Sequence, residues 1–224
     1  MKGRLQAINA ERIIIIVRHG ESIKNRKGIH GGSGESLTEE GRAQVKNVAS
    51  LIQSQIGKKR LETAAIFSPN NIQAVESAEL FSICLGTNNY ELLSIESLNM
   101  GVAHGITQEE LRRSYPSAAS SLDLWRNRQI DISQLAVPGM GDPLIFYNLG
   151  LQELQKIRCN DMSIVVCTSS LFILFTNILL KKNVEPGGNY LHIPIDNCDL
   201  VAFSVDETET ILLPELTTVS IEWL

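Results

Sequence analysis

The chain has 224 residues, of which 43% are hydrophobic and 20% charged, and its mean hydropathy is +0.01. This composition is typical of a globular protein with a sizeable core, and one domain accounts for the length because α/β domains often exceed about 200 residues. The formal net charge of −5 argues against a general nucleic-acid binder, which needs a basic face. It leaves room for a local basic pocket that binds an anion.

The cysteines and the apolar stretches indicate a cytoplasmic protein. The sequence contains four cysteines, Cys84, Cys159, Cys167 and Cys198. Their spacing fits no zinc motif, so we expect reduced thiols and no metal. Residues 1–11 lack the features of a signal peptide. Residues 164–180 approach the length of a membrane span, but Thr168-Ser169-Ser170 interrupts them, which favours a buried strand, a turn and a buried helix.

The first predicted element is a buried strand over the β-branched run at residues 13–17. It delivers Arg18 and His19 to its carboxyl end, where Gly20 breaks the run. In open α/β sheets, ligands bind outside the carboxyl ends of the strands. The sequence therefore indicates a functional site at Arg18 and His19.

The remaining elements alternate between strands and helices. We expect strands at residues 64–67, 91–95 and 163–167, and a closing hairpin from 199–205 and 211–213 around Asp206-Glu207. We expect helices from Thr38 to about Gly57, at 72–85, from Thr107, at 142–157 and at 171–180. This order predicts an α/β three-layer sandwich with a mainly parallel sheet and helices on both faces. Residues 1–224 are expected to form a single domain with a variable cap around 106–141.

The residues after the first strand resemble a known family. Arg18-His19-Gly20-Glu21, with Asn25 six residues after His19, is similar to the opening motif of the histidine phosphatase superfamily, also called phosphoglycerate-mutase-like. Leu-Thr-Glu-Glu-Gly at 37–41, Phe-Ser-Pro at 67–69 and Gly-x-x-x-Gly-x-Thr at 101–107 extend the resemblance, the last of them toward the bisphosphatase branch. It covers nearly the whole chain and implies the same three-layer fold.

The resemblance also implies a mechanism. In this family the first histidine attacks a phosphoryl group and carries it as phosphohistidine, while two arginines and a second histidine hold the phosphate and an acid protonates the leaving oxygen. His19 matches the nucleophile, Arg18 the first arginine, and Asn25 a polar contact near the phosphate. No cofactor is implied.

Three other family positions depart from the pattern. The second arginine aligns with Gln73, the acid with Ser97, and the second histidine with Thr168, which Ser169 follows. Gln73, Thr168 and Ser169 can bind phosphate through hydrogen bonds but bring no charge, and the loss of one preorganised donor typically costs about 10² to 10³ in rate.

The sequence leaves several roles open. Glu96, next to Ser97, or His104 is a candidate for the missing acid. The cations at positions 24, 26 and 27 either are solvated or supply the missing positive charge. Trp125, Arg126 and Arg128 either recognise a substrate from the cap region or simply pack and solvate a helix.

Two functions follow from these patterns. The first is a divergent phosphomonoesterase or mutase that binds a phosphate ester at Arg18 and His19 and has weak or rebuilt activity through phosphohistidine on His19. The second is an inactive pseudophosphatase that binds a phospholigand or a protein. The expected partner is a phosphorylated small molecule or a phosphopeptide, without nucleic acid or membrane, and a homo-oligomer is left open.

Overall fold

The computed structural model describes residues 12–31, 34–206, 209–220, 222 and 224. Residues 1–11, where the sequence predicts no signal peptide, and Glu207 of the predicted hairpin turn lie outside the described residues. The structure has six strands within that part of the chain: β1 (Ile13–Arg18), β2 (Ala65–Ser68), β3 (Asn89–Leu92), β4 (Met162–Cys167), β5 (Leu200–Val205) and β6 (Thr210–Leu212).

The strands form one mixed sheet in the order β3-β2-β4-β1-β5-β6. The first four of these run parallel to one another, and β5 and β6 complete the sheet in antiparallel pairing. The carboxyl ends of β1, β2 and β4 therefore meet at one edge, as the alternation of strands and helices predicts. The α/β prediction with a mainly parallel sheet is confirmed.

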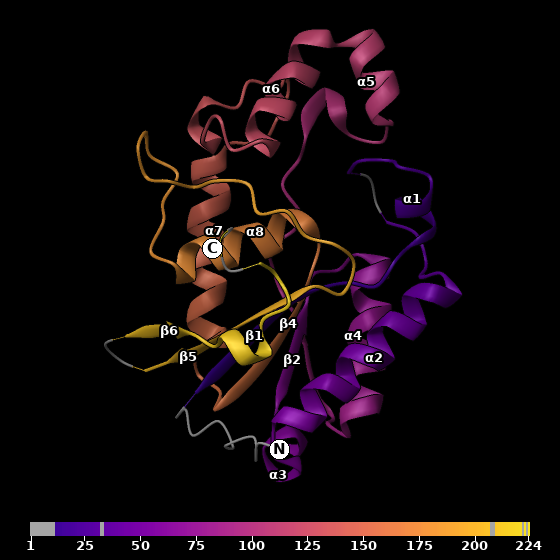
Figure 1. Ribbon diagram of the computed structural model, residues 1–224, viewed down its shortest axis with the longest axis vertical. Helices are drawn as coiled ribbons and strands as arrows, with labels where there is room; N and C mark the ends of the chain where they lie inside the picture. The colour runs from indigo at the N-terminus through magenta and orange to yellow at the C-terminus, as the bar shows by residue number, and fades with distance from the viewer. Residues whose placement is uncertain (1–11, 32–33, 207–208, 221, 223) are drawn as a thin grey trace.

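Helices cover both faces of the sheet, and the side chains of β1 divide between them (Figure 1). Ile13, Ile15 and Val17 face the cluster that includes α2 (Glu39–Gln55) and α4 (Ile72–Leu85). Ile14 and Ile16 face the cluster that includes α7 (Pro143–Ile157) and α8 (Ser169–Leu179). Burial on both faces explains why β1 is a continuous apolar run instead of an alternating one.

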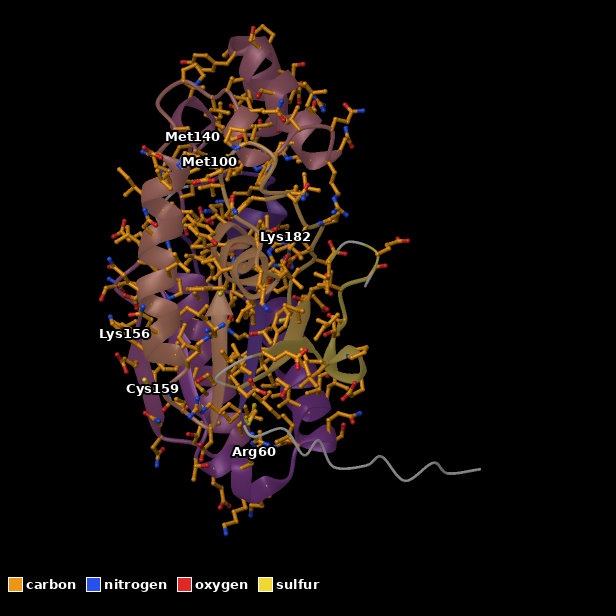
Figure 2. All side chains as sticks on the ribbon, turned by 90° about the vertical axis from the view of Figure 1, so that its left-hand side faces the viewer. Arg60, Met100, Met140, Lys156, Cys159 and Lys182 are labelled. Carbon is orange, nitrogen blue, oxygen red and sulfur yellow. The ribbon has the colours of Figure 1, made fainter. Side chains whose placement is uncertain are left out.

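The segment between β3 and α7 lies above the carboxyl edge of the sheet, at the top of Figure 1. It contains η1 (Gly101–Ala103), α5 (Gln108–Ser114), α6 (Pro116–Arg126) and η2 (Ile132–Gln134). Its two connections to the rest of the chain run side by side, since Met100 forms a β-bridge with Met140, as Figure 2 shows from another side. We call this paired connection the neck.

Two local predictions are wrong, and one helix was not predicted. That helix is α1 (Ile23–Arg26), which Ser22 caps in a capping box with Asn25. The helix expected from Thr38 to about Gly57 ends at Gln55, and Gly57 precedes a further short helix, α3 (Lys58–Glu62). The third strand lies at Asn89–Leu92 instead of 91–95, because its pairing with β2 sets its register. None of the described helices is both long and apolar enough to cross a membrane.

Candidate functional site

A cavity of about 770 Å³ lies between the carboxyl edge of the sheet and the α5–α6 segment. All eight candidate residues from the sequence line it: Arg18, His19, Asn25, Gln73, Glu96, His104, Thr168 and Ser169. The fold thus brings together residues that lie as far apart in the sequence as positions 18 and 169.

His19 has the hydrogen bonding of a neutral nucleophile. Its side chain is buried, and Nδ1 lies 2.7 Å from the carbonyl oxygen of Gly20. Because a carbonyl oxygen only accepts, Nδ1 carries the proton and Nε2 keeps its lone pair. Burial, with smaller effects from the Arg18 and Lys24 charges, lowers the pKa of His19 to about 3. The imidazole is therefore neutral at physiological pH.

Arg18 is the last residue of β1 and is held by the loop before β5. Its Nη1 donates to the carbonyl oxygen of Ile195 at 2.9 Å. Its Nε is buried and has no hydrogen-bond partner among the described residues. Burial lowers the pKa of Arg18, while Asp196 and Asp199 oppose that shift. The guanidinium remains charged and retains hydrogen-bonding capacity for an anion.

Asn25 anchors the loop after β1. Its Oδ1 accepts hydrogen bonds from the backbone N–H of Ser22 at 3.1 Å and from Nδ2 of Asn197 at 3.2 Å. Nδ2 of Asn197 also lies 3.0 Å from the carbonyl oxygen of His19. Asn25 and Asn197 together fix the backbone at His19 and Ser22, and no sequence motif singled out Asn197.

Gln73 lies on the first turn of α4 and is 2% exposed. Its Oε1 is buried without a hydrogen-bond partner in the described part of the chain, and Gly34 packs so closely that a Cβ there would meet this atom at 2.2 Å. One turn later, Ser77 receives a hydrogen bond from the backbone N–H of Gly20 at 3.1 Å. Hence α4 both supports the turn that carries His19 and places a neutral amide in the cavity wall.

Ser97 and Thr168, which the sequence analysis aligned with the acid and the second histidine of the family, form a pair of hydroxyl groups. Oγ of Ser97 and Oγ1 of Thr168 lie 2.7 Å apart. Thr168 is the N-cap of α8, but its side chain makes no capping bond because it is directed to Ser97. Thr168 and Ser169 therefore bring the amino-terminal end of α8 to the cavity, where the helix dipole favours negative charge.

Glu96 and His104 are both exposed on the cavity wall. Glu96 lies beside Ser97 in the segment after β3, and His104 follows η1. The imidazole of His104 packs against Gly31, where a Cβ would meet its Nδ1 at 2.7 Å. Both side chains therefore reach solvent as well as the cavity.

The three cations that the sequence left open have different surroundings. Arg26 forms an ion pair with Glu21 at 2.6 Å, and Lys27 pairs with Glu35 at 3.2 Å. Lys24 instead lines the cavity, with its Nζ bonded to the carbonyl oxygen of Gly31. Burial lowers the pKa of Lys24. Arg26 and Lys27 are accordingly surface partners of carboxylates, whereas Lys24 faces the cavity.

The end of the cavity under α6 is lined largely by rings. Trp125 and His192 pack edge to face, with ring centroids 4.9 Å apart. Burial, with smaller effects from Arg126 and Arg128, lowers the pKa of His192 to about 4, so its imidazole is neutral. Tyr190 is buried and lines the same cavity. The sequence offered no periodic pattern for His192 or Tyr190, because both lie in the irregular segment between α8 and β5.

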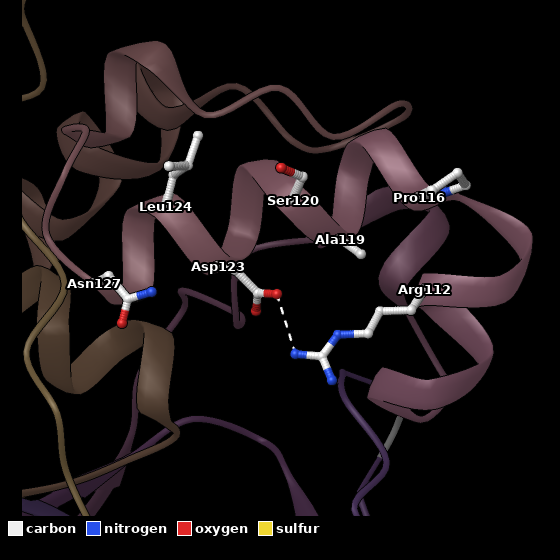
Figure 3. Close-up of a pocket in the computed structure, with 7 residues that line it drawn as sticks. All are labelled: Arg112, Pro116, Ala119, Ser120, Asp123, Leu124 and Asn127. Carbon is white, nitrogen blue, oxygen red and sulfur yellow. Dashed lines mark hydrogen bonds and ion pairs between the residues drawn. The ribbon is translucent and has the colours of Figure 1, made fainter.

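A second, shallower depression of about 360 Å³ lies along α5 and α6 (Figure 3). Its most polar contact is the ion pair between Arg112 and Asp123 at 3.1 Å. None of the candidate residues lines it.

Neither a metal nor a reactive thiol is indicated in the part of the chain described. No group of three His, Cys, Asp or Glu side chains there could hold a metal ion. Cys167 precedes Thr168 but is fully buried, and burial raises the pKa of its thiol, which disfavours the thiolate.

The sequence profile of the histidine phosphatase superfamily (branch 1) matches residues 14–213. The chain belongs to this superfamily.

Two curated relatives are both described as 6-phosphofructo-2-kinase/fructose-2,6-bisphosphatase. The protein from Arabidopsis thaliana is 27% identical over 110 residues, or 49% of this chain and 14% of the relative. The protein from Gallus gallus is 29% identical over 119 residues, or 52% of this chain and 23% of the relative. The matches thus span less than a quarter of either relative.

Solved structures of the same fold cover most of the chain. A mycobacterial glucosyl-3-phosphoglycerate phosphatase, solved with VO₃, has a TM-score of 0.72 at 18% identity, covering 90% of this chain and 97% of its own. A phosphoglycerate mutase from Bacillus anthracis has a TM-score of 0.68 at 16% identity, covering 90% and 91%. These identities establish the fold alone.

Proposed function

We propose that the cavity binds a phosphate ester with its phosphoryl group between Arg18 and His19, and that His19 accepts this group slowly. The observation that carries the proposal is the neutral, buried His19 ring, whose Nδ1–H is fixed by Gly20 so that Nε2 has a free lone pair. An imidazole with a fixed tautomer is a competent nucleophile toward phosphorus.

In the proposed reaction, Nε2 of His19 forms a bond to phosphorus as the ester P–O bond breaks. Arg18 and Lys24 offset the charge on the phosphoryl oxygens. The leaving oxygen takes a proton from Glu96 or His104, and water then attacks the phosphohistidine to release inorganic phosphate. Gln73, Thr168 and Ser169 bind the phosphoryl group through hydrogen bonds. The reaction is slow because these groups supply no second guanidinium and no second imidazole.

The proposed site belongs to a single domain. We propose that residues 1–224 form a single domain and that residues 106–141 act as its cap over the ester. The closely paired neck at Met100 and Met140 supports this division.

A second candidate function is phosphate-ester binding without turnover. The 2.7 Å contact between Ser97 and Thr168 favours it, because these hydroxyl groups bind each other where the family has an acid and a histidine. Such a protein would act as a phospholigand-binding module.

One set of variants tests both candidates. Hydrolysis of a panel of phosphate esters and binding of inorganic phosphate are measured for the wild type, His19→Ala and Arg18→Ala, with Ser120→Ala outside the cavity as the control. The proposal predicts slow hydrolysis that is lost in His19→Ala and phosphate binding that is lost in Arg18→Ala. Binding without hydrolysis would support the second candidate, and absence of binding would overturn both.

A further inference from the structure

We propose that the end of the cavity under α6 is a subsite for the alcohol part of the ester, and that this alcohol carries an uncharged ring instead of a second acidic group. The inference rests on the proposed function, since it assumes that the phosphoryl group lies at Arg18 and His19. It goes further by defining the chemical class of the substrate.

The walls of this subsite are apolar and aromatic. Trp125 and Phe146 supply rings from α6 and α7, and Ile132 and Leu122 add aliphatic surface. All four side chains belong to the same hydrophobic core cluster. A ring that enters the subsite therefore exchanges water for apolar and aromatic contacts, whereas a carboxylate would lose hydration without gaining a partner.

The guanidinium that α6 contributes to this end of the cavity already has partners, and one of them, Asp123, is shared with Arg112. Arg126 is the cation that α6 contributes to the wall, and its Nη1 lies 2.8 Å from Oε1 of Gln108 and 3.6 Å from Oδ1 of Asp123. His192 is neutral for the reasons given above, and burial also lowers the pKa of His30. A second anion would thus compete with Asp123 for the one guanidinium on α6.

Two buried polar atoms of the subsite lack hydrogen-bond partners within the described part of the chain, which favours a ring that carries hydrogen-bonding atoms over a hydrocarbon ring. Nε1 of Trp125 and Nδ1 of His192 are buried and have no hydrogen-bond partner among the residues that the structure describes. Trp125 itself is 7% exposed. Leaving such groups unpaired is costly, so a ring with donor and acceptor atoms on its edge would satisfy them after a small adjustment of the two side chains.

The size of the cavity agrees with this class of ligand. Its volume of about 770 Å³ is within the range of roughly 300–1,000 Å³ typical of pockets that bury most of a drug-sized ligand. A heteroaromatic ring joined to the phosphate through a short linker, as in a nucleoside monophosphate, meets each requirement.

A matched pair of ligands tests the inference. Thymidine 5′-monophosphate and 2-deoxyribose 5-phosphate differ in the uncharged base, and calorimetry gives their Kd values beside that of inorganic phosphate. We expect the ring-bearing ester to bind about tenfold tighter than the sugar phosphate. Trp125→Leu should remove this preference and leave the Kd of inorganic phosphate within about twofold, since Trp125 lies at the other end of the cavity.

Further variants keep the test decisive. Trp125→Phe retains a ring but lacks the indole N–H, and should lose part of the preference if Trp125→Leu does not fold. Leu124→Ala, an exposed neighbour on α6, should behave as the wild type.

Equal Kd values for the two esters, or tighter binding of 3-phosphoglycerate than of the nucleotide, would overturn the inference while phosphate binding still supports the proposed function. Failure of inorganic phosphate to bind would overturn the proposed function itself, and the inference with it.

Discussion

Lys24 occupies a different environment from the two other cations of the same loop. Arg26 and Lys27 have carboxylate partners, Glu21 and Glu35, whereas the Nζ of Lys24 reaches the carbonyl oxygen of Gly31 at the cavity wall. Its charge is close enough to His19 to contribute to the lowered pKa of that imidazole. Lys24 is therefore the side chain best placed to supply positive charge beside the neutral amide of Gln73.

Replacing Lys24 tests this compensation. Lys24→Met should weaken the binding of inorganic phosphate about five- to tenfold, because one partly buried charge near the anion is lost. Lys27→Met is the matched control, since Lys27 is exposed and does not line the cavity. Calorimetric Kd values for both variants provide the measurement, and equal effects would show that only the overall charge of the loop matters.

The buried imidazole of His19 also makes stability depend on pH. Its pKa is about 3 in the folded chain, compared with about 6.5 for an unperturbed histidine. Between these values the unfolded chain binds more protons, so His19 lowers the free energy of unfolding progressively as the pH falls below about 6.5, by at most about 1.4 kcal/mol per pH unit. His192 acts in the same direction through its pKa of about 4.

We therefore expect His19→Gln to lose less stability than the wild type when the pH falls from 7 to 5. Urea unfolding at both pH values measures this difference, with each chain compared with itself at pH 7. Parallel losses in the two chains would mean that the imidazole of His19 is not buried in its neutral form.

The sequence predicted which residues meet at the site better than it predicted how they interact. The strand pattern and the family motif place Arg18 and His19, because both are local features of the chain. The partner of Thr168 and the surroundings of Lys24 depend on how distant loops pack, and neither leaves a periodic signal. The pairing of Ser97 with Thr168 joins residues 71 positions apart and therefore required the structure.

At the scale of elements, two glycines let α2 approach the turn after β1. A Cβ on Gly20 would meet the carbonyl oxygen of Gly41 at 2.4 Å, and a Cβ on Gly41 would meet the carbonyl oxygen of Glu21 at 2.1 Å. Thr38 caps α2 and donates to Oε1 of Glu21 at 2.7 Å. The motif residues Glu21, Thr38 and Gly41 thus hold the backbone that carries His19, which gives them a structural role.

Gly41→Ala should be destabilising by about 1–3 kcal/mol, because the new methyl group would overlap backbone atoms that cannot rotate away. Gly57→Ala serves as the control, since Gly57 has a φ of −62° and a methyl group added there would have no heavy atom within 4 Å. Chemical denaturation compares the two variants. A loss in Gly41→Ala no greater than that in Gly57→Ala would contradict the tight packing of α2.

Long elements were predictable and short ones were not. The apolar periodicity of α2, α4 and α7 locates them to within one or two residues, because each buries a face. The four-residue α1 has no buried residue, so periodicity could not reveal it. Its one local signal is Ser22, followed three residues later by Asn25 in the reciprocal arrangement of a capping box.

At the scale of the whole molecule, the neck links the α5–α6 segment to the sheet. Gly101 has a φ of +55°, and a Cβ there would meet the carbonyl oxygen of Pro138 at 2.1 Å. The backbone N–H of Val102 donates to that same oxygen at 2.9 Å. The two chain segments of the neck are in direct backbone contact, which fixes the roof of the cavity above His19.

Gly101→Ala should destabilise the protein more than Gly105→Ala does. Both glycines have positive φ, +55° and +80°, so both substitutions introduce backbone strain of about 1 kcal/mol. Gly105 has open space around it, whereas Gly101 would also collide with the opposite segment of the neck. Thermal unfolding of both variants measures the difference, and equal losses would indicate that the neck is loosely packed.

The central claim is that His19 receives a phosphoryl group from an ester bound beside Arg18. The most direct measurement is to quench the protein with base during incubation with thymidine 5′-monophosphate and to search for phosphohistidine by mass spectrometry, which also locates the modified residue. The account predicts phosphate on His19, a reduced amount in Arg18→Ala and none in His19→Ala. Hydrolysis of the ester with no phosphate on His19 and full activity in His19→Ala would contradict it.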